Sequence, residues 1–266
     1  MRPWLEACRA ATGSRSARVG SSRRTSRMSP VAKVGEGGDE TTAIDAAAEE
    51  VVIARLRETG EACVVVSEEL GELELGGGGP LRVVVDPIDG SLNAKRDIPF
   101  FALSVAVADG DTMGDIVFGY VHDFGSGEEW TATRGGGAFL DGRALGAVRP
   151  KDEIEILSFE ATTTAEVAER AAAVAGAAHR LRIMGSLALS LCHLAAGRVD
   201  GVCSLKPARS VDIAAAQLLV REVGLAIDLF EEPPFEAAPL DLVGRSRVVA
   251  AGTTALCERL ATALSA

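Results

Sequence analysis

The sequence predicts an α/β or α+β fold in which strands and helices form a layered sandwich. Two observations favour this class. Short apolar runs typical of strands, such as residues 62–67 and 81–85, end at charged residues or turns. Amphipathic or Ala-rich segments typical of helices, such as residues 43–59 and 211–223, lie between them. The 266 residues suffice for one large domain or two closely joined halves.

In the first half, residues 43–59 form the first amphipathic helix, with Val51 on its apolar side and Glu49 and Glu50 on its polar side. Gly60 is placed to end this helix. The strands predicted in this half are residues 62–67, 81–85, 101–108 and 116–121.

The second half alternates more regularly. Its predicted strands are residues 154–159, 181–184, 199–205, 225–229 and 248–251, and its predicted helices are residues 164–175, 187–196, 211–223 and 254–264. We find no internal repeat and no long linker. We therefore expect a basic helix and linker at residues 1–34, then one domain at 35–266 with halves at about 35–150 and 151–266.

The net charge of −11 is unevenly spread along the chain. Residues 1–34 carry about +7, which leaves about −18 on the rest. An acidic body argues against a nucleic-acid partner, because such proteins need a basic face. The Arg-rich start is interpreted as a short helix over residues 3–11 followed by a solvated linker; the alternative is an organellar transit sequence.

Membrane and redox signals point to the cytoplasm. No apolar run is long enough to span a bilayer, and the start lacks the apolar core of a secretory signal. The cysteines are scattered without a CxxC pair, which suggests reduced thiols. They are Cys8, Cys63, Cys192, Cys203 and Cys257.

The most informative segment is V-V-V-D-P-I-D-G-S-L-N at residues 83–93. An apolar strand delivers Asp86 to its carboxyl end, where loops in α/β sheets gather ligands. Pro87 fixes the backbone, so that Ile88 offers a carbonyl oxygen and Asp89 a second carboxylate. These oxygen donors suit a hard cation such as Mg²⁺. The alternative is a solvated Asp-rich turn.

Residues beside and outside this turn add to the same candidate site. Gly90 and Ser91 can begin a helix whose free N–H groups favour a phosphate. Glu68 follows its own strand, and Asp212 lies in the first turn of an Ala-rich helix. Taken singly, Glu68 reads as a solvated loop acid, Asp212 as a helix-start charge, and Asp45 as a surface residue.

Together these residues resemble the inositol monophosphatase family, within the larger group that includes fructose-1,6-bisphosphatases and nucleotide 3′-phosphatases. The resemblance covers about residues 39–252. It rests on S-E-E at 67–69, D-P-I-D-G-S-x-N at 86–93, R-G-G-G-A-F at 134–139, M-G-S-L-A at 184–188, V-D-I-A-A-A at 211–216 and E-V-G at 222–224. It implies a layered αβαβα sandwich of the sugar-phosphatase type, a homodimer, and a Mg²⁺-dependent, Li⁺-sensitive phosphatase.

The resemblance also implies roles for single residues. Two or three Mg²⁺ ions are expected, with the ligands Glu68, Asp86, the Ile88 carbonyl, Asp89 and Asp212. The catalytic residues would be Glu68, Asp45 and Ser91, the last two orienting the attacking water; many relatives have Thr where Ser91 stands. The substrate-binding positions would include Asp89, Gly90, Ser91, Asn93 and Ser186.

The departures from the family pattern bear on the substrate. Leu205 stands where animal inositol phosphatases have a Glu that contacts an inositol hydroxyl, and Lys206 and Arg209 follow it. Basic groups beside the cleft can bind a second phosphate; the alternative is that both are merely solvated. Val211 and Ala216, where relatives have Trp and Gly, are interpreted as packing changes.

The expected function is therefore Mg²⁺-dependent hydrolysis of a small-molecule phosphate ester, inositol 1-phosphate first and fructose 1,6-bisphosphate second. The alternatives are a 3′-phosphoadenosine 5′-phosphate type of nucleotide phosphatase and a catalytically silent metal-binding homologue. Three other patterns are disfavoured: Cys192-x5-Arg198 as a thiol-phosphatase loop, Asp109-Gly-Asp111 as a phosphate acceptor, and a zinc site among the scattered histidines.

Overall fold

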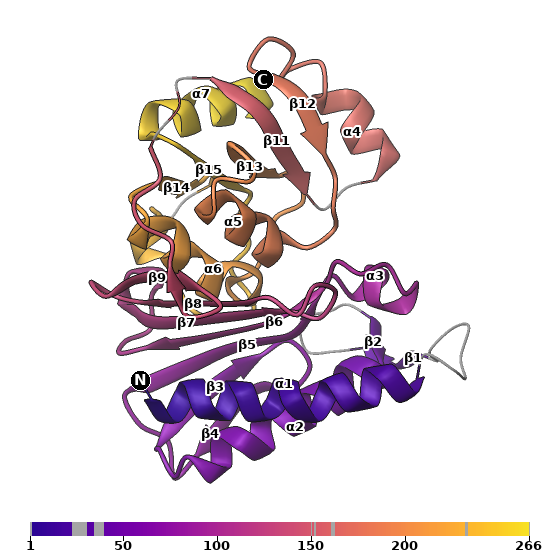
Figure 1. The fold of residues 1–266 in the computed structure, drawn as a ribbon, viewed down its shortest axis with the longest axis vertical. Coiled ribbons are helices and arrows are strands. Elements are labelled where there is room, and N and C mark those ends of the chain that lie inside the picture. The colour runs from indigo at the N-terminus through magenta and orange to yellow at the C-terminus, as the bar shows by residue number, and fades with distance from the viewer. Residues whose placement is uncertain are drawn as a thin grey trace.

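The computed structural model describes residues 2–22, 31–34, 40–149, 151, 153–160, 163–231 and 234–265. Helices and sheets alternate in layers through the molecule (Figure 1). On one side, α1 (Arg2–Ser22) and α2 (Ala43–Glu58) cover a large sheet. Next come α5 (Leu187–Ala195) and α6 (Ser210–Glu222), then a second sheet covered by α7 (Thr254–Ser265). This arrangement confirms the predicted αβαβα sandwich.

The large sheet has eight strands and is mostly antiparallel, but β3 and β5 are parallel neighbours near one edge. Its strands in sheet order are β10 (Arg143–Ala144), β9 (Gly137–Leu140), β8 (Glu129–Thr133), β7 (Ile116–Asp123), β6 (Ala102–Ala108), β5 (Leu81–Asp89), β3 (Cys63–Ser67) and β4 (Gly71–Leu75). Parallel pairing makes β3 and β5 end side by side, with Ser67 opposite Val85. Glu68, which follows β3, and Asp86, which follows the last residue of β5 that pairs with β3, therefore lie at the same edge.

The second sheet has five strands, and its β12, β11 and β13 are parallel. Its strands in sheet order are β12 (Ala178–Arg182), β11 (Ile154–Glu160), β13 (Gly201–Ser204), β15 (Val248–Ala251) and β14 (Ala226–Leu229). The remaining elements are α3 (Ser91–Lys95), α4 (Thr164–Arg170), two 3-10 turns at Met113–Asp115 and Phe235–Ala237, and a separate pair, β1 (Val31–Val34) with β2 (Glu40–Thr42).

The two halves share one core. A single apolar cluster joins Val84 and Trp130 of the large sheet to Leu191 of α5 and Leu219 of α6. Burial of this apolar surface is the main force that holds the halves together. Val211 and Ala216 are buried in the same cluster, which agrees with their interpretation as packing changes.

The amino-terminal helix corrects one prediction. It runs from Arg2 to Ser22 rather than ending near residue 11. Its first half is part of the core, because Trp4 and Cys8 pack with Val52 of α2. Residues 23–30 of the predicted linker lie outside the described residues, as do residues 35–39, and residues 31–34 of that linker form strand β1.

Other boundaries differ by a few residues. α4 ends at Arg170 instead of residue 175, and β5 continues to Asp89. Strand β4 was not predicted, because its sequence G-E-L-E-L offers only two apolar residues. No helix of the described ranges is both long and apolar enough to cross a membrane.

Candidate functional site

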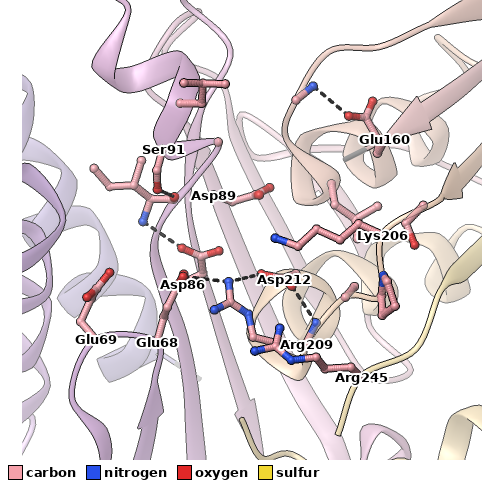
Figure 2. A pocket seen from close by; sticks show the side chains of 18 of the residues that line it. Glu68, Glu69, Asp86, Asp89, Ser91, Glu160, Lys206, Arg209, Asp212 and Arg245 are labelled. Carbon is pink, nitrogen blue, oxygen red and sulfur yellow. Dashed lines mark hydrogen bonds and ion pairs between the residues drawn. The ribbon is translucent and has the colours of Figure 1, made fainter. Parts of the chain in front are cut away.

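A cavity of about 430 Å³ opens between the carboxyl ends of β3 and β5 and the elements of the second half (Figure 2). One side of its lining comes from residues 68–95, which include Glu68, Asp86 and Asp89. The other side comes from residues 160–212 together with Arg245. The cavity therefore lies where the two halves of the molecule meet.

The end of β5 is irregular, and this irregularity delivers its carboxylates. Asp86 pairs with Ser104 of β6 and Asp89 with Ala102, so the register shifts between them. The Ile88 N–H donates to Asp86 Oδ1 at 3.0 Å, and the Ser91 hydroxyl donates to the Ile88 carbonyl at 2.9 Å. An extra residue of this kind bends a strand and re-aims its side chains. Here Asp86 and Asp89 both line the cavity.

Three carboxylates from distant parts of the chain converge. Glu68, Asp86 and Asp212 each offer one oxygen, and these oxygens all lie within 4.8 Å of one another. Glu68 follows β3, Asp86 ends the apolar part of β5, and Asp212 lies in the first turn of α6. Carboxylate oxygens in such a group are the donors that Mg²⁺ or Mn²⁺ prefers, so the residues fit a divalent ion.

Arg209 lies against this cluster instead of being solvated. Its Nη2 is 2.8 Å from Glu68 Oε1 and 3.3 Å from Asp212 Oδ1, and Figure 2 shows the guanidinium between the two carboxylates. The Arg209 side chain is only 7% exposed. Its backbone N–H also donates to Asp212 Oδ2 at 2.7 Å. The arginine therefore supplies positive charge at the ligand oxygens themselves.

Burial makes the carboxylates of this site hard to ionise. It raises the pKa of Glu68 to about 7, even though Arg209 lowers it. Burial also raises the pKa of Asp86 well above its usual value, with the neighbouring Glu68 and Asp89 charges adding to the effect. Close like charges in a poorly solvated place attract a cation strongly. The cluster is therefore a site that a bound cation would stabilise.

Asp89 is held by the start of α5. Its Oδ2 accepts the Ser186 hydroxyl at 2.6 Å and the Ala188 N–H at 2.7 Å. Ser186 caps the helix, and free N–H groups at a helix start favour a carboxylate. Burial nevertheless raises the pKa of Asp89 to about 7, against the lowering by the Ser186 hydrogen bond.

Some predicted site residues are not part of the cavity lining that the described residues form. Asp45 is buried on α2, one turn before Ala48, which packs against Ile88. Asn93 points to backbone, because its Nδ2 donates to the carbonyls of Phe100 at 2.8 Å and Met184 at 2.7 Å. Gly90, Ser91, Lys206 and Arg209 do line the cavity. Leu205 is buried in the outer core of the second sheet.

One supporting residue was misread from the sequence. Glu49, expected on the polar side of its helix, is only 3% exposed. It accepts the Ser67 hydroxyl and, at 3.1 Å, the Leu70 N–H. It therefore fixes the turn that carries Glu68. Its position four residues after Asp45, on the same helix face, was the only signal in the sequence.

Other lining residues were also missed. Lys95, Glu160 and Arg245 all line the cavity, although none belongs to a motif used above. No local pattern marks them, because only the fold brings them to the cavity.

The competing thiol-phosphatase pattern is not supported. Cys192 is fully buried within α5, and this burial raises the pKa of its thiol well above the ordinary value, which is the opposite of what a nucleophilic cysteine needs. Arg198 pairs with Glu128 at 2.6 Å. All the cysteines are free and buried.

Comparison with known proteins agrees with this geometry. The profile of the inositol monophosphatase family matches residues 5–266. The chain is 33% identical over 240 residues to a fructose-1,6-bisphosphatase/inositol-1-monophosphatase of Methanothermobacter thermautotrophicus, covering 86% of this chain and 85% of that one. It is 36% identical over 195 residues to the Nus factor SuhB of Escherichia coli, covering 70% of each.

The fold is likewise shared with solved structures. The extragenic suppressor protein SuhB from Bartonella henselae superimposes with a TM-score of 0.77 at 27% identity, covering 99% of this chain and 97% of that chain. A family match over nearly the whole sequence, a relative of similar length and a common fold lead to one conclusion. The chain belongs to the inositol monophosphatase family.

Proposed function

We propose that this protein is a Mg²⁺-dependent phosphatase that hydrolyses phosphate monoesters of small polyols or sugars. The observation that carries the proposal is the convergence of Glu68, Asp86 and Asp212 within 4.8 Å in a cavity that basic side chains also line. The acidic side chains can bind divalent ions, and the basic side chains can bind an anionic ester. The names of the archaeal relatives support the same reaction.

In this proposal Glu68, Asp86 and the Ile88 carbonyl hold one Mg²⁺, and a second lies among Asp86, Asp89 and Asp212. Bound Mg²⁺ lowers the pKa of a coordinated water and neutralises charge on the phosphate.

The chain's own groups bind and orient the ester. In this proposal the backbone N–H groups of Gly90 and Ser91, two residues that line the cavity, donate to the phosphate. The Ser91 hydroxyl, which lies 2.9 Å from the Ile88 carbonyl, orients the attacking water in this scheme. Asp45 assists from α2, the helix that packs behind Ile88.

Inositol 1-phosphate is the first candidate substrate, and fructose 1,6-bisphosphate is the second. Leu205 is packed in the core and offers nothing to an inositol hydroxyl. Lys206 is exposed at the cavity, and Lys95 and Arg245 also line it. These cations favour an ester with a second negative group. A dual activity, as in the name of the archaeal relative, follows from this lining.

A second candidate is a metal-binding protein that works through a partner without turnover. The similarity to relatives named Nus factor SuhB favours it. The chain has every carboxylate of the cluster and also the cavity. This favours an active phosphatase over a protein without turnover, because a protein that had lost catalysis would no longer need the complete set.

The test is phosphate release from inositol 1-phosphate, fructose 1,6-bisphosphate and 3′-phosphoadenosine 5′-phosphate, each with Mg²⁺ and with chelator. We expect release that requires Mg²⁺ and is fastest for one of the first two. Release from the nucleotide alone would contradict the proposed substrate class. Tight Mg²⁺ binding without release from any ester would establish the silent homologue. Homodimer formation and a cytoplasmic location remain predictions.

A further inference from the structure

Glu160 is a buried acid at the cavity that the proposed reaction does not use. It ends β11, the central parallel strand of the second sheet, and is only 1% exposed. A carboxylate in such a place is costly unless donors surround it. Glu160 accepts several hydrogen bonds, and the donors show which segment it holds in place.

The two carboxylate oxygens of Glu160 have different partners. Oε1 accepts the hydroxyls of Ser158 at 2.6 Å and Ser190 at 2.7 Å, and more weakly the Met184 N–H at 3.4 Å. Oε2 accepts the backbone N–H of Gly185 at 2.8 Å. The serines anchor the carboxylate in the second half, and the other oxygen holds a loop at the cavity (Figure 2).

The held loop packs against the segment that carries Asp89. Gly185 has φ +88°, and a Cβ on Gly90 would lie 3.0 Å from the Gly185 carbonyl. Asn93 of α3 donates to the Met184 carbonyl at 2.7 Å. Residues 184–185 are therefore fixed by Glu160 from the second half and by Asn93 from the first.

The residues that follow this loop bind Asp89. Ser186 Oγ and the Ala188 N–H both donate to Asp89 Oδ2. Two donors on the same oxygen set the plane of the carboxylate, and with it the direction of Oδ1. A shift of Gly185 would move Ser186 and turn Asp89.

We propose that Glu160 is a positioning residue: by holding the Gly185 N–H it sets the orientation of Asp89 toward a divalent ion. This inference rests on the proposed function, in which Asp89 is a metal ligand. Partners of this kind, which orient a ligand without touching the ion, change metal affinity about 10–100-fold when they are lost.

Two substitutions separate this role from a simple effect of charge. Glu160→Gln keeps the length of the side chain, so its carbonyl oxygen can accept the Gly185 N–H while its amide faces hydroxyls that can accept. Glu160→Asp keeps the charge but is one methylene too short to reach Gly185. Glu155→Asp, on the exposed part of the same strand, is the matched control.

Magnesium affinity, measured by calorimetry, is the first readout. We expect E160D to weaken binding about tenfold or more, with E160Q and E155D within about twofold of wild type. Ser186→Ala should weaken binding too, and the E160D/S186A pair should be less than additive, because both act on one path. E160Q weaker than E160D would mean that the charge acts directly, and unchanged affinity in E160D would mean that Glu160 only stabilises the fold. Either result overturns the proposal.

Amide hydrogen exchange without metal is the second readout. The N–H groups of Gly185 and Ala188 should exchange faster in E160D but stay protected in E160Q. Equal protection in both variants contradicts the positioning role whether or not the protein binds Mg²⁺. A wild-type protein that binds no divalent ion would instead remove the proposed function, and the exchange data would still decide whether Glu160 positions Asp89.

Discussion

The two walls of the cavity differ in charge and in construction. The wall from the first half carries Glu68, Asp86 and Asp89 on the ends of two neighbouring strands. The wall from the second half carries Lys206, Arg209 and Arg245 on loops around β13 and α6, together with the acids Glu160 and Asp212. Three of the four carboxylates proposed as metal ligands thus come from the ends of sheet strands, and most of the cations come from loops. We infer that the first wall is built to hold metal ions and the second to adapt to the ester.

If the acidic wall holds the ions, removing one of its charges should have the largest effect. We expect Asp89→Asn to lower kcat/KM by about a thousandfold or more, because a metal ligand and its charge are lost. The same change should stabilise the chelated protein at pH 8 because Asp89 is an unfavourable buried charge there. We expect the unfolding free energy to rise by about 1–2 kcal/mol and the melting temperature to rise with it.

Asp111→Asn is the control, since Asp111 is exposed in the turn before the Met113–Asp115 helix. It should leave rate and stability unchanged. A near-wild-type rate in D89N would remove Asp89 from the reaction, whereas loss of activity in D111N would revive the alternative Asp109-Gly-Asp111 motif.

Arg209 is the point where the two walls touch, and its removal should have the next largest effect. Arg209→Met should strengthen Mg²⁺ binding about tenfold, because the guanidinium contacts the oxygens of Glu68 and Asp212 that the ion needs. It should also destabilise the chelated protein by roughly 3 kcal/mol, as expected for loss of one partner of a buried ion pair.

Calorimetry and thermal melts check both effects, with Arg221→Met, a half-buried arginine on the same helix that pairs with Glu236, as the control. Weaker Mg²⁺ binding in R209M would mean that the arginine orients Asp212 for the ion instead of competing with it.

On the second wall, Lys206 should affect one substrate more than the other. Lys206→Ala should raise KM for fructose 1,6-bisphosphate about tenfold and leave KM for inositol 1-phosphate within about threefold. Steady-state kinetics on both esters measures this, with Lys151→Ala, paired to Asp200 away from the cavity, as the control. Equal effects on the two esters would place Lys206 at the reacting phosphate.

The smallest expected effect is on the pH dependence of stability. The folded pKa values of Glu68 and Asp89 are about 7, above their ordinary values of 4.5 and 3.8. The folded protein therefore binds more protons than the unfolded chain between about pH 4 and 7, so the unfolding free energy of the chelated protein falls as the pH rises through this window.

His193, whose pKa is lowered by burial, acts in the opposite direction, so the comparison with D89N isolates the carboxylate. Thermal melts from pH 5 to 8 should show a steeper fall for wild type than for D89N. Parallel curves would mean that Asp89 is ionised throughout this range.

The acidic wall could be predicted from the sequence, because its signals are local. Apolar strands end directly at Glu68 and Asp86, and parallel pairing then brings those ends together. Asp212 was found by its place at the start of an Ala-rich helix. The layered fold followed from the same alternation of strands and helices.

The second wall and the supporting residues could not be predicted in the same way. An arginine is usually solvated, and nothing near Arg209 in the sequence shows that its guanidinium turns toward Glu68, 141 positions earlier. Glu49 and Glu160 have partners that only the fold brings close. The length of α1 was missed because residues 12–22 lack an apolar period and are rich in Gly and Ser, which give only a weak preference for helix.

The central claim is that acids from both walls bind divalent ions together, and anomalous scattering tests it most directly. Crystals grown in saturating Mn²⁺ should show a peak among Glu68, Asp86 and Asp212, with Arg209 moved off the Glu68 oxygen. A structure at the same Mn²⁺ concentration with no peak there, and with Arg209 still bound to Glu68 and Asp212, would contradict the account.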